Sequence, residues 1–412
     1  MSNLRINIIN TFLLFFAIFP LIPNKIKGLP VAILFFVTLV FYKKGKAQIS
    51  KLLVSSSLFL IYFLSILYSD DKTQSFSKIE TALSMLVLPL SFFLLLADYK
   101  ITNSFRKVFF KLFIVSSSLF SLFSLLFFVS NSKYIYLIEE NRRLITNMPL
   151  IGQHPIYASI FLSVSIFFFI TLIKNNNLKY NKTGFLFFFL VLLNVCVLLL
   201  ILSKGVVISL FFVLFVQVLN IQTLKRIKYV LVFVIISLLI TLFIYNNRMN
   251  KLIKVSTYGA LNTNSSTSIR LGIYDCSFKV IQNKLLFGHG IGDAQRSLNK
   301  CYANKSDILL MHRFNSHNQY LDVLIKTGVI GFLIFLFFLV YNLKHALKTK
   351  NNLLLMIVLF YSIVFFTENV LSRQSGVIFF FFLICLNSQF NLNLNTNVEN
   401  TKPKPLQNSQ RL

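Results

Sequence analysis

The chain has 412 residues, of which 56% are hydrophobic and only 13% are charged, and its mean hydropathy is +0.73. These values exclude an ordinary soluble domain and indicate an integral membrane protein. The formal net charge of +29 would suggest a polyanionic partner, but most of the cations lie in short segments between apolar runs. Membrane topology accounts for cations in such places, so we expect no nucleic acid partner.

A helix that spans a bilayer needs about 20 mainly apolar residues. The sequence contains twelve such runs, several of them short, and therefore predicts an all-α membrane protein. The first run lacks a small-residue cleavage site, so we interpret it as a membrane helix and not as a signal peptide. The runs are centred on residues 7–22, 29–42, 52–68, 79–97, 108–129, 154–173, 184–202, 205–221, 228–245, 319–343, 353–367 and 375–390.

The basic residues orient these helices. Lys and Arg concentrate in the cytoplasmic loops of membrane proteins. With the N-terminus inside, the cytoplasmic segments carry more than twice as many of them as the short external loops, so both termini are expected in the cytoplasm. The chain then divides into helices 1–9 in residues 1–245, an external loop at 246–318, helices 10–12 at 319–390, and a polar tail at 391–412 that we expect to be disordered.

Two external loops, residues 130–153 and 246–318, are too long to be simple turns, and loops of that length usually carry function. Part of the larger loop predicts a short amphipathic helix lying on the outer membrane surface. The apolar residues at helical spacing in this part are Tyr274, Phe278, Ile281 and Leu285.

The same loop contains the only candidate disulfide pair. Cys276 and Cys301 both lie in it, whereas Cys196 and Cys385 fall inside apolar runs. A segment that lies outside the membrane can form disulfides. The sequence leaves both a disulfide and two free thiols open.

His317 lies where the external loop meets the tenth apolar run, in the sequence SHNQYL. A neutral imidazole can take a proton from a hydroxyl group at physiological pH. This position at the membrane boundary suits a general base that meets a lipid-linked substrate. The alternative is an interfacial histidine that caps the tenth helix, with Asn318 or Ser316 completing the cap.

Two charges follow His317 inside the tenth helix. Asp322 and Lys326 are four residues apart and share a helical face, where they would neutralise each other. Charges inside a membrane usually point inward, so we expect this face to line a cavity. Gly328 and Gly331 come next and would let a neighbouring helix approach closely.

Four basic residues are candidates for binding phosphate. Arg270 precedes the predicted amphipathic helix, where a guanidinium could hold a phosphate through two hydrogen bonds, and a solvated loop arginine is the alternative. Lys204 is a lone cation in a short turn between two apolar helices, which is costly unless a ligand or carboxylate neutralises it. Arg142 and Arg143 could touch substrate or pair with the glutamates that precede them.

His154 begins the sixth apolar run, where it could cap the helix or form a polar wall of an active site. The sequence FGHGIGD has glycines at 288, 290 and 292, which could form a backbone nest for an anion. His312 and His317 have no thiol or paired acid at metal-ligand spacing. We therefore expect neither a metal nor another cofactor.

The order of these features resembles the O-antigen ligase and polymerase family of bacterial envelopes. The segment RLGIYDCSFKVIQNKLLFGHGIGDAQRSLNKCY is similar to an arginine, amphipathic helix and glycine turn of that family. The segment FNSHNQYLDVLIKTGVIGFLIFL resembles its histidine-bearing entry into a membrane helix. The SKG sequence at residues 203–205 resembles a family SRG turn.

The resemblance implies an O-antigen ligase that transfers a glycan from a polyprenyl (undecaprenyl) pyrophosphate carrier to a lipid A-core acceptor, without a metal and with inversion. The reaction would take place at the periplasmic face of the bacterial inner membrane. His317 would be the base, and Arg270 and Lys204 would bind the pyrophosphate. Further candidates for substrate binding are Arg142, Arg143, Asn318 and His154.

The chain departs from the family pattern at two positions. Lys204 stands where arginine is usual, and a lysine cannot make the bidentate contact. His289 stands where an apolar residue is usual, so it is not expected to be catalytic.

Three other functions stay open. A repeat-unit polymerase and a protein O-oligosaccharyltransferase of the same family differ from a ligase mainly in the acceptor, which the sequence does not display. The loop that carries the histidine resembles the ligases more. A flippase or exporter of lipid-linked glycan would also need many helices and inward cations, but it would not need an external histidine-bearing loop of this length.

Overall fold

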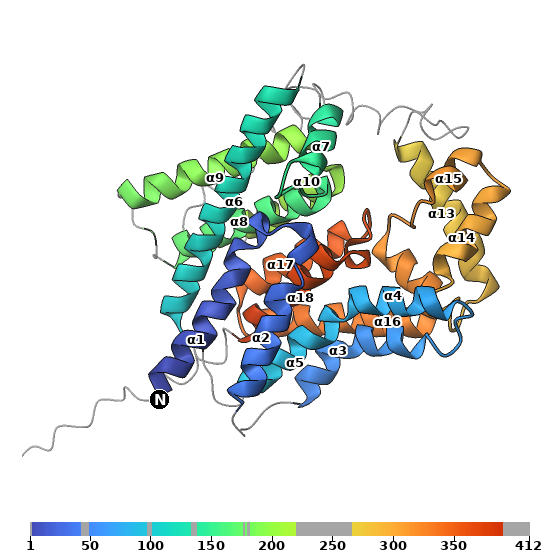
Figure 1. Ribbon diagram of the computed structural model, residues 1–412, viewed down its shortest axis with the longest axis horizontal. Coiled ribbons are helices and arrows are strands. Elements are labelled where there is room, and N and C mark those ends of the chain that lie inside the picture. The colour runs from blue at the N-terminus through green and yellow to red at the C-terminus, as the bar shows by residue number, and fades with distance from the viewer. Residues whose placement is uncertain are drawn as a thin grey trace, which may run out of the picture.

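The computed structural model describes residues 2–42, 49–96, 101–132, 138–175, 178, 182–219 and 266–389, and all its regular elements in these ranges are helices (Figure 1). The first group comprises α1 (Ser2–Leu14), η1 (Phe15–Leu21), η2 (Asn24–Ile26), α2 (Leu29–Val40), α3 (Ile49–Leu64), α4 (Lys72–Ala82), α5 (Ser84–Leu96), α6 (Asn103–Asn131), α7 (Ile138–Asn147), α8 (Pro155–Lys174), α9 (Lys182–Ile201) and α10 (Lys204–Leu219). The second comprises α13 (Ser266–Asn283), α14 (Ala294–Ala303), α15 (Asp307–His312), α16 (Gln319–Lys348), α17 (Asn352–Val364), η4 (Val370–Ser372) and α18 (Gln374–Gln389).

The predicted all-α membrane fold is confirmed over the described ranges. Six helical segments there are long and apolar enough to cross a membrane, and four shorter apolar helices accompany them. Eleven of the twelve predicted runs coincide with helices, while the run at 228–245 lies outside the described residues. The count of twelve spans and the position of the external loop therefore stay predictions. The six long segments are Leu4–Leu21, Lys72–Leu95, Asn103–Asn131, Pro155–Lys174, Lys182–Ile201 and Gln319–Lys348.

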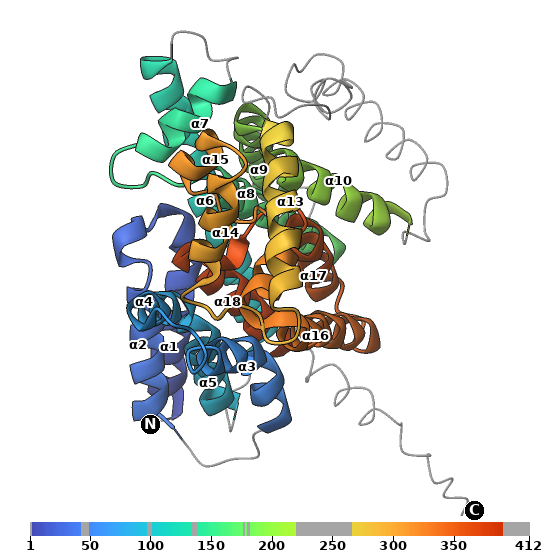
Figure 2. The same cartoon turned by 90° about the vertical axis from the view of Figure 1, so that its right-hand side faces the viewer.

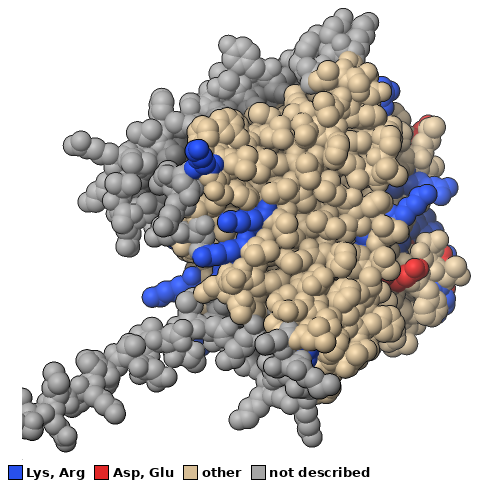
Figure 3. All heavy atoms as spheres, turned by 60° about the vertical axis from the view of Figure 1, so that its left-hand side comes forward, with Lys and Arg blue, Asp and Glu red and all other residues tan. Residues whose placement is uncertain are grey.

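The surface supports a membrane location. The face seen in Figure 3 is a broad area of uncharged residues, with charged residues gathered toward its two opposite edges. Large apolar side chains such as Phe36, Leu126 and Phe185 are exposed on the helices. A bilayer would cover such surface, whereas water would not stabilise it. The chain is thus a multi-pass membrane protein.

Stacked phenylalanines pack the helices together. The ring of Phe16 lies 4.0 Å from that of Phe382, which joins the first helical segment to α18. The rings of Phe110 and Phe168 lie 4.4 Å apart and join α6 to α8. Flat rings at this separation combine large apolar contact with favourable stacking. The many phenylalanines therefore form the interior of the bundle as well as its outer surface.

The helices α13, α14 and α15 form a small group beside the bundle, next to α4 and α16 (Figures 1 and 2). Its interior is built from Ile273, Val280, Leu298, Tyr302 and Leu309, all buried. A disulfide joins Cys276 on α13 to Cys301 on α14, which decides the question that the sequence left open. A cross-link of this kind restricts the unfolded chain and so favours the folded group.

The predicted amphipathic helix exists as α13, and its predicted apolar residues divide between the protein interior and the surface. Ile281 is buried, whereas Phe278 is 56% exposed and Leu285, beyond the end of α13, is 51% exposed. The face that packs on α14 is instead centred on Cys276 and Val280. That the helix lies on a membrane surface stays a prediction.

Three further helices in the loops were not predicted: α7, α14 and α15. Each has ten residues or fewer, so each offers only two or three turns of periodicity. Helices this short gain their stability from tertiary contacts. In α7 these contacts are made by Asn141 and Ile145, which are fully buried.

The long helix α16 is broken at Gly328, where φ is +63° and the backbone is not helical. The loop after α13 fills the break. The N–H groups of Val329 and Ile330 donate to the carbonyls of Leu285 and Leu286, at 2.9 and 3.4 Å. A Cβ atom at Gly328 would lie 2.2 Å from the carbonyl oxygen of Leu286. Glycine is therefore required here, both by the left-handed backbone and by the close approach of the loop.

The glycine-rich loop also donates hydrogen bonds to α16 on the other side of the break. The N–H groups of His289 and Gly290 donate to the carbonyls of Ile325 and Lys326, at 2.8 and 2.9 Å. Backbone groups within a membrane protein must find such partners where a helix is interrupted. The four bonds across the break thus tie the α13–α15 group to α16. The expectation that a helix approaches Gly328 was wrong, since a loop does.

The two charges of α16 are paired as predicted. Nζ of Lys326 lies 2.5 Å from Oδ2 of Asp322, and it stands 5.4 Å above the ring of Tyr62 on α3. Both charged residues line a cavity, which also agrees with the sequence. Gly331 faces Ile61 on α3, so the expected close helix contact occurs at this glycine.

A second lysine is buried and is bound by an amide. The side chain of Lys27, in the turn before α2, is inaccessible to solvent, and its Nζ donates to Oε1 of Gln153 at 2.5 Å. It lies 4.9 Å from the ring centres of both Phe19 and Phe161. Burial lowers the pKa of this lysine from 10.5 to about 7. The folded protein therefore disfavours the charged form.

Replacing this lysine should change how stability depends on pH. The unfolded chain keeps the Lys27 proton up to pH 10.5 and the folded chain loses it near 7, so the free energy of unfolding rises with pH between these values. From pH 7 to 9 the rise is roughly 2–3 kcal/mol. Lys27→Met should abolish this component and raise the melting temperature at pH 7. Thermal unfolding in detergent at pH 7 and 9 measures both.

The exposed neighbour Lys25 provides the control, because Lys25→Met removes the same charge from the surface of the same turn. This control should keep the pH dependence of the wild type. An unchanged pH dependence in Lys27→Met would show that Lys27 is not the group responsible.

Candidate active site

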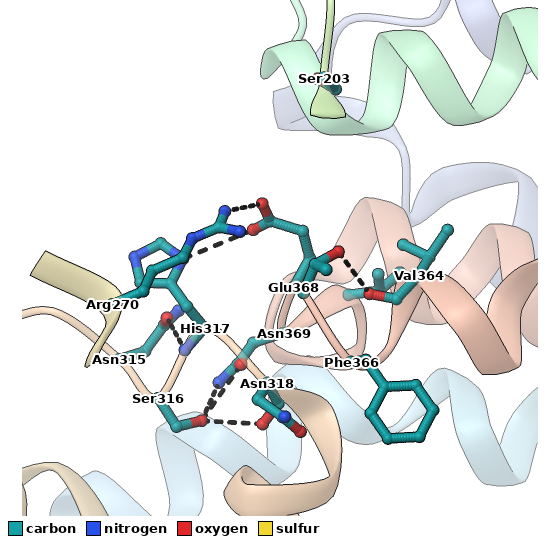
Figure 4. Close-up of polar contacts among 12 residues, drawn as sticks. Ser203, Arg270, Asn315, Ser316, His317, Asn318, Val364, Phe366, Glu368 and Asn369 are labelled. Atoms are coloured by element: carbon teal, nitrogen blue, oxygen red, sulfur yellow. Dashed lines mark hydrogen bonds and ion pairs between the residues drawn. The ribbon is translucent and has the colours of Figure 1, made fainter. Parts of the chain in front are cut away.

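The side chains of His317, Glu368 and Arg270 meet at the N-terminal end of α16 (Figure 4). Nη2 of Arg270 lies 2.5 Å from Oε1 of Glu368, and Nδ1 of His317 lies 3.5 Å from Oε2. The carboxylate thus bridges the guanidinium and the imidazole. Its side chain is 11% exposed, against 29% for Arg270 and 28% for His317, so it is the most buried of the three groups. A carboxylate at such a site needs positive partners, because an unpaired buried charge is costly.

The two nitrogens of the His317 ring have different surroundings. Nδ1 is buried and faces Glu368, with no hydrogen bond in the described part of the chain. The 3.5 Å separation is longer than a hydrogen bond, so the contact is electrostatic, and contacts of this kind often tighten when substrate binds. Nε2 is then the nitrogen available to take a proton from a substrate.

The backbone of His317 is strained, with φ at +45° in the left-handed region. This conformation costs a residue with a side chain about 1–2 kcal/mol. Local contacts hold it in place: the His317 N–H donates to Oδ1 of Asn315 at 3.0 Å, and Nδ2 of Asn369 donates to Oγ of Ser316 at 2.9 Å. Strain that the surroundings maintain in this way is typical of functional positions.

The adjacent Asn318 caps α16. Its side-chain oxygen accepts from the N–H groups of Tyr320 and Leu321 at 2.9 and 3.2 Å. These are donors that the first turn of a helix leaves free. Asn318 thus completes the cap, as the alternative interpretation expected, whereas the imidazole of His317 faces Glu368 and takes no part in the cap. A contact of Asn318 with substrate stays a prediction.

Glu368 follows α17 in the short connection to α18. Burial raises the pKa of this carboxyl, but the close contacts with His317 and Arg270 lower it by more, so the net shift is downward. The group is therefore a carboxylate at neutral pH, with a fixed negative charge beside the imidazole.

His154 stands at the start of α8, but its side chain makes no capping hydrogen bond. Its pKa is lowered from 6.5 to about 4, first by burial and then by the charges of Arg373, Arg142 and His317, which outweigh the carboxylate of Glu368. The imidazole is therefore neutral at physiological pH. His154 therefore lies within electrostatic range of Glu368 and His317, which favours its role as a polar wall of the site over a role as a helix cap.

Arg142 on α7 ties the neighbouring loops together. Its Nη1 donates to the carbonyl of Ile201 at 3.3 Å and to Oγ of Ser203 at 3.0 Å. Arg143 is exposed, and in the described ranges no hydrogen bond or ion pair joins it to His317. The structure thus brings Arg142 to the turn before α10 and leaves Arg143 outside the cluster.

Lys204 is the first residue of α10 and is partly buried. The next residue, Gly205, packs so closely on Thr367 that a Cβ atom there would lie 1.9 Å from its Oγ1. Thr367 directly precedes Glu368. The turn that carries Lys204 is therefore adjacent to the loop that carries the central carboxylate.

Other expectations about ligands have different outcomes. The glycine loop is not available as an anion nest, because its N–H groups at 288–290 donate to protein carbonyls. His289 joins this loop to the helices beside it, through Val280 and Ser297, so its role is structural. Among the described residues, no group of three His, Cys, Asp or Glu side chains could hold a metal ion. A reaction without metal stays a prediction.

These observations define a class: a polytopic helical membrane protein with a histidine, a carboxylate and an arginine gathered at one end of a membrane helix. A family model described as O-antigen ligase matches residues 186–336, a segment that contains Lys204, Arg270 and His317. Residues 186–336 are therefore similar in sequence to the O-antigen ligase family, in agreement with the resemblance of their motifs.

One curated relative also matches. An uncharacterized protein of Haemophilus influenzae is 29% identical over 136 residues, which cover 30% of this chain and 34% of that protein. The chain thus matches about a third of the length of that relative.

Glu368 was not predicted from the sequence. This residue lies outside the matched segment and 98 positions after Arg270. One signal was available, since the sequence TENVLSRQ places a lone carboxylate between two apolar runs. A single acid at a helix end has many ordinary roles, so only the fold reveals its partners.

Replacing the carboxylate by an amide of the same shape tests this geometry. Glu368→Gln should lower glycan transfer about a hundredfold, because the imidazole loses the charge that orients it and stabilises its protonated form. Initial transfer rates at matched protein levels measure the effect, and Glu368→Asp should lose less because it keeps the charge.

Asp307→Asn is the control, since Asp307 is an exposed acid on α15, in the same group of helices as Arg270. It should retain the wild-type rate. If Glu368→Gln also retained it, Glu368 would have no part in the reaction.

Proposed function

We propose that this protein is an O-antigen ligase that transfers a glycan from a polyprenyl pyrophosphate to a lipid A-core acceptor. The observation that carries the proposal is the contact of Arg270 and His317, both within the segment that matches the ligase family, with one buried carboxylate. An imidazole, an orienting acid and a fixed cation are the groups that a metal-free glycosyl transfer needs.

His317 is the general base of the proposed reaction. Nε2 takes the proton of an acceptor hydroxyl as its oxygen attacks the anomeric carbon of the donor sugar. The bond from that carbon to the pyrophosphate breaks, and polyprenyl pyrophosphate leaves with the bonding electrons. Glu368 holds the ring through Nδ1 and stabilises the imidazolium that forms. The proton then passes to solvent.

The cations of the site receive the pyrophosphate. Arg270 can offer guanidinium donors beyond the one that contacts Glu368. Lys204 is the first residue of α10, and the next residue packs on the loop that carries Glu368. Arg142 positions the turn of Lys204, and His154 supplies a neutral polar wall. Fixed positive charge at the leaving group replaces a divalent metal in this proposal. Attack opposite the leaving group inverts the anomeric configuration.

The proposed location is the periplasmic side of the bacterial inner membrane. The distribution of Lys and Arg between loops favours both termini in the cytoplasm. The N-terminal end of α16 would then face the periplasm, where the sugar of the donor and the acceptor hydroxyl can meet, while the polyprenyl chain stays in the bilayer. A polymerase or a protein O-oligosaccharyltransferase would use the same chemistry on another acceptor.

The deciding experiment compares purified wild type and His317→Gln on a lipid-linked glycan donor and lipid A-core. The variant should transfer about 10²–10⁴-fold more slowly, the usual contribution of a general base. Both proteins should be insensitive to chelator, because the proposed cations need no metal partner.

His312→Gln is the matched control, because His312 is an exposed histidine five residues earlier, on α15. It should transfer at the wild-type rate. Near-normal transfer by His317→Gln would remove the base from the mechanism. Loss of wild-type transfer in chelator, with recovery on adding magnesium, would contradict the metal-free proposal.

A further inference from the structure

A cavity of about 670 Å³ opens close to the His317 cluster, and no step above uses it. It lies between α4, α14, α16 and the residues around η4, and Asn315, which holds the His317 backbone, forms part of its wall. Five cations line it against two carboxylates. The cations are Lys78, Arg296, Arg313, Lys326 and Arg373, and the carboxylates are Asp71 and Asp322.

Some of these charges are already neutralised within the protein. Lys326 is paired with Asp322 at the buried end of the cavity, and Arg296 is paired with Asp293 at 2.9 Å. The carboxylate of Asp71 accepts the N–H of Gln74 at 2.9 Å and so caps α4. The internal pairs therefore leave a net positive charge on the cavity.

The remaining cations stand at its exposed side. Lys78, Arg313 and Arg373 are all exposed, and within the described ranges none of them forms an ion pair with a carboxylate. Arg313 has a left-handed backbone, with φ at +44°, which fixes where its side chain leaves the chain. Three solvated cations from separate elements around one cavity attract a ligand with negative charge.

Neutral polar groups complete the lining. Gln74, Thr81, Asn299 and Asn315 contribute amide and hydroxyl groups. Such groups bind the hydroxyls of a saccharide. A polyprenyl chain would be a poor occupant, because the buried end carries the Asp322–Lys326 pair and apolar chains do not cover charges favourably. The lining therefore suits a hydrophilic sugar that carries an anionic group.

We propose that this cavity binds the acceptor saccharide and selects one that bears a phosphate or carboxylate group. The inference rests on the proposed transfer reaction and adds a property of its acceptor. Neither Arg270 nor Lys204 is among the residues that line the cavity. The donor pyrophosphate and the acceptor anion thus have separate cations, with His317 between the two substrates. Lys78 and Arg313 contact the acceptor anion, and Arg373 faces both the cavity and His154.

The test uses the double variant Lys78→Gln, Arg313→Gln and two acceptor preparations, lipid A-core and the same material after chemical removal of its phosphates. With the phosphorylated acceptor, the KM for acceptor should rise about tenfold, since hydrogen bonds to charged groups are lost. The kcat and the KM for donor should stay within about twofold of wild type. With the dephosphorylated acceptor, wild type and variant should have the same KM.

Two further variants separate charge from folding. Lys78→Arg, Arg313→Lys keeps both charges and should retain the low KM, so a loss in the glutamine variant alone is an effect of charge. Lys300→Gln removes an exposed cation of α14 that lies outside this cavity, and it should behave as wild type.

An unchanged KM for the phosphorylated acceptor in the glutamine variant would overturn the inference, as would an equal rise for both acceptors. A rise in the KM for donor would assign the cavity to the donor and also overturn it. These outcomes leave the proposed function intact. Failure of wild type to transfer any glycan to either acceptor would instead refute the proposed function itself.

Discussion

One buried carboxylate organises the candidate site. Glu368 has little access to water, so its charge is stable only beside positive groups. Arg270 supplies the positive charge and the imidazole of His317 faces the same carboxylate, and the three residues come from α13, the loop before α16 and the connection after α17. The need to neutralise a single anion thus draws together segments far apart in the sequence. The same anion orients the base that the proposed reaction requires.

This arrangement depends on how the α13–α15 group is attached to the membrane helices. The break in α16 at Gly328 exposes backbone groups, and the loop after α13 satisfies them. The disulfide between Cys276 and Cys301 holds the group itself together. Arg270 sits on α13, so these bonds fix the guanidinium relative to His317. A residue in the glycine loop can therefore matter to the reaction without touching substrate.

Patterns of neighbouring residues predicted the features that depend on interactions within one helix. Apolar runs gave the membrane helices, and the spacing of Asp322 and Lys326 gave their pairing and their inward face. The sequence could not predict Glu368, because its role comes from partners on other helices. The cationic cavity was likewise hidden, since its residues come from elements that only the fold brings together.

We propose that Arg270 and Glu368 act as one unit with His317, and a double-mutant cycle tests this coupling directly. The initial transfer rate would be measured for Arg270→Ala, for Glu368→Ala and for the two combined. If the pair acts together, the double variant should be about as slow as the slower single variant, because residues in direct contact lose a shared interaction only once. Losses that simply multiply in the double variant would show independent roles and would contradict the account.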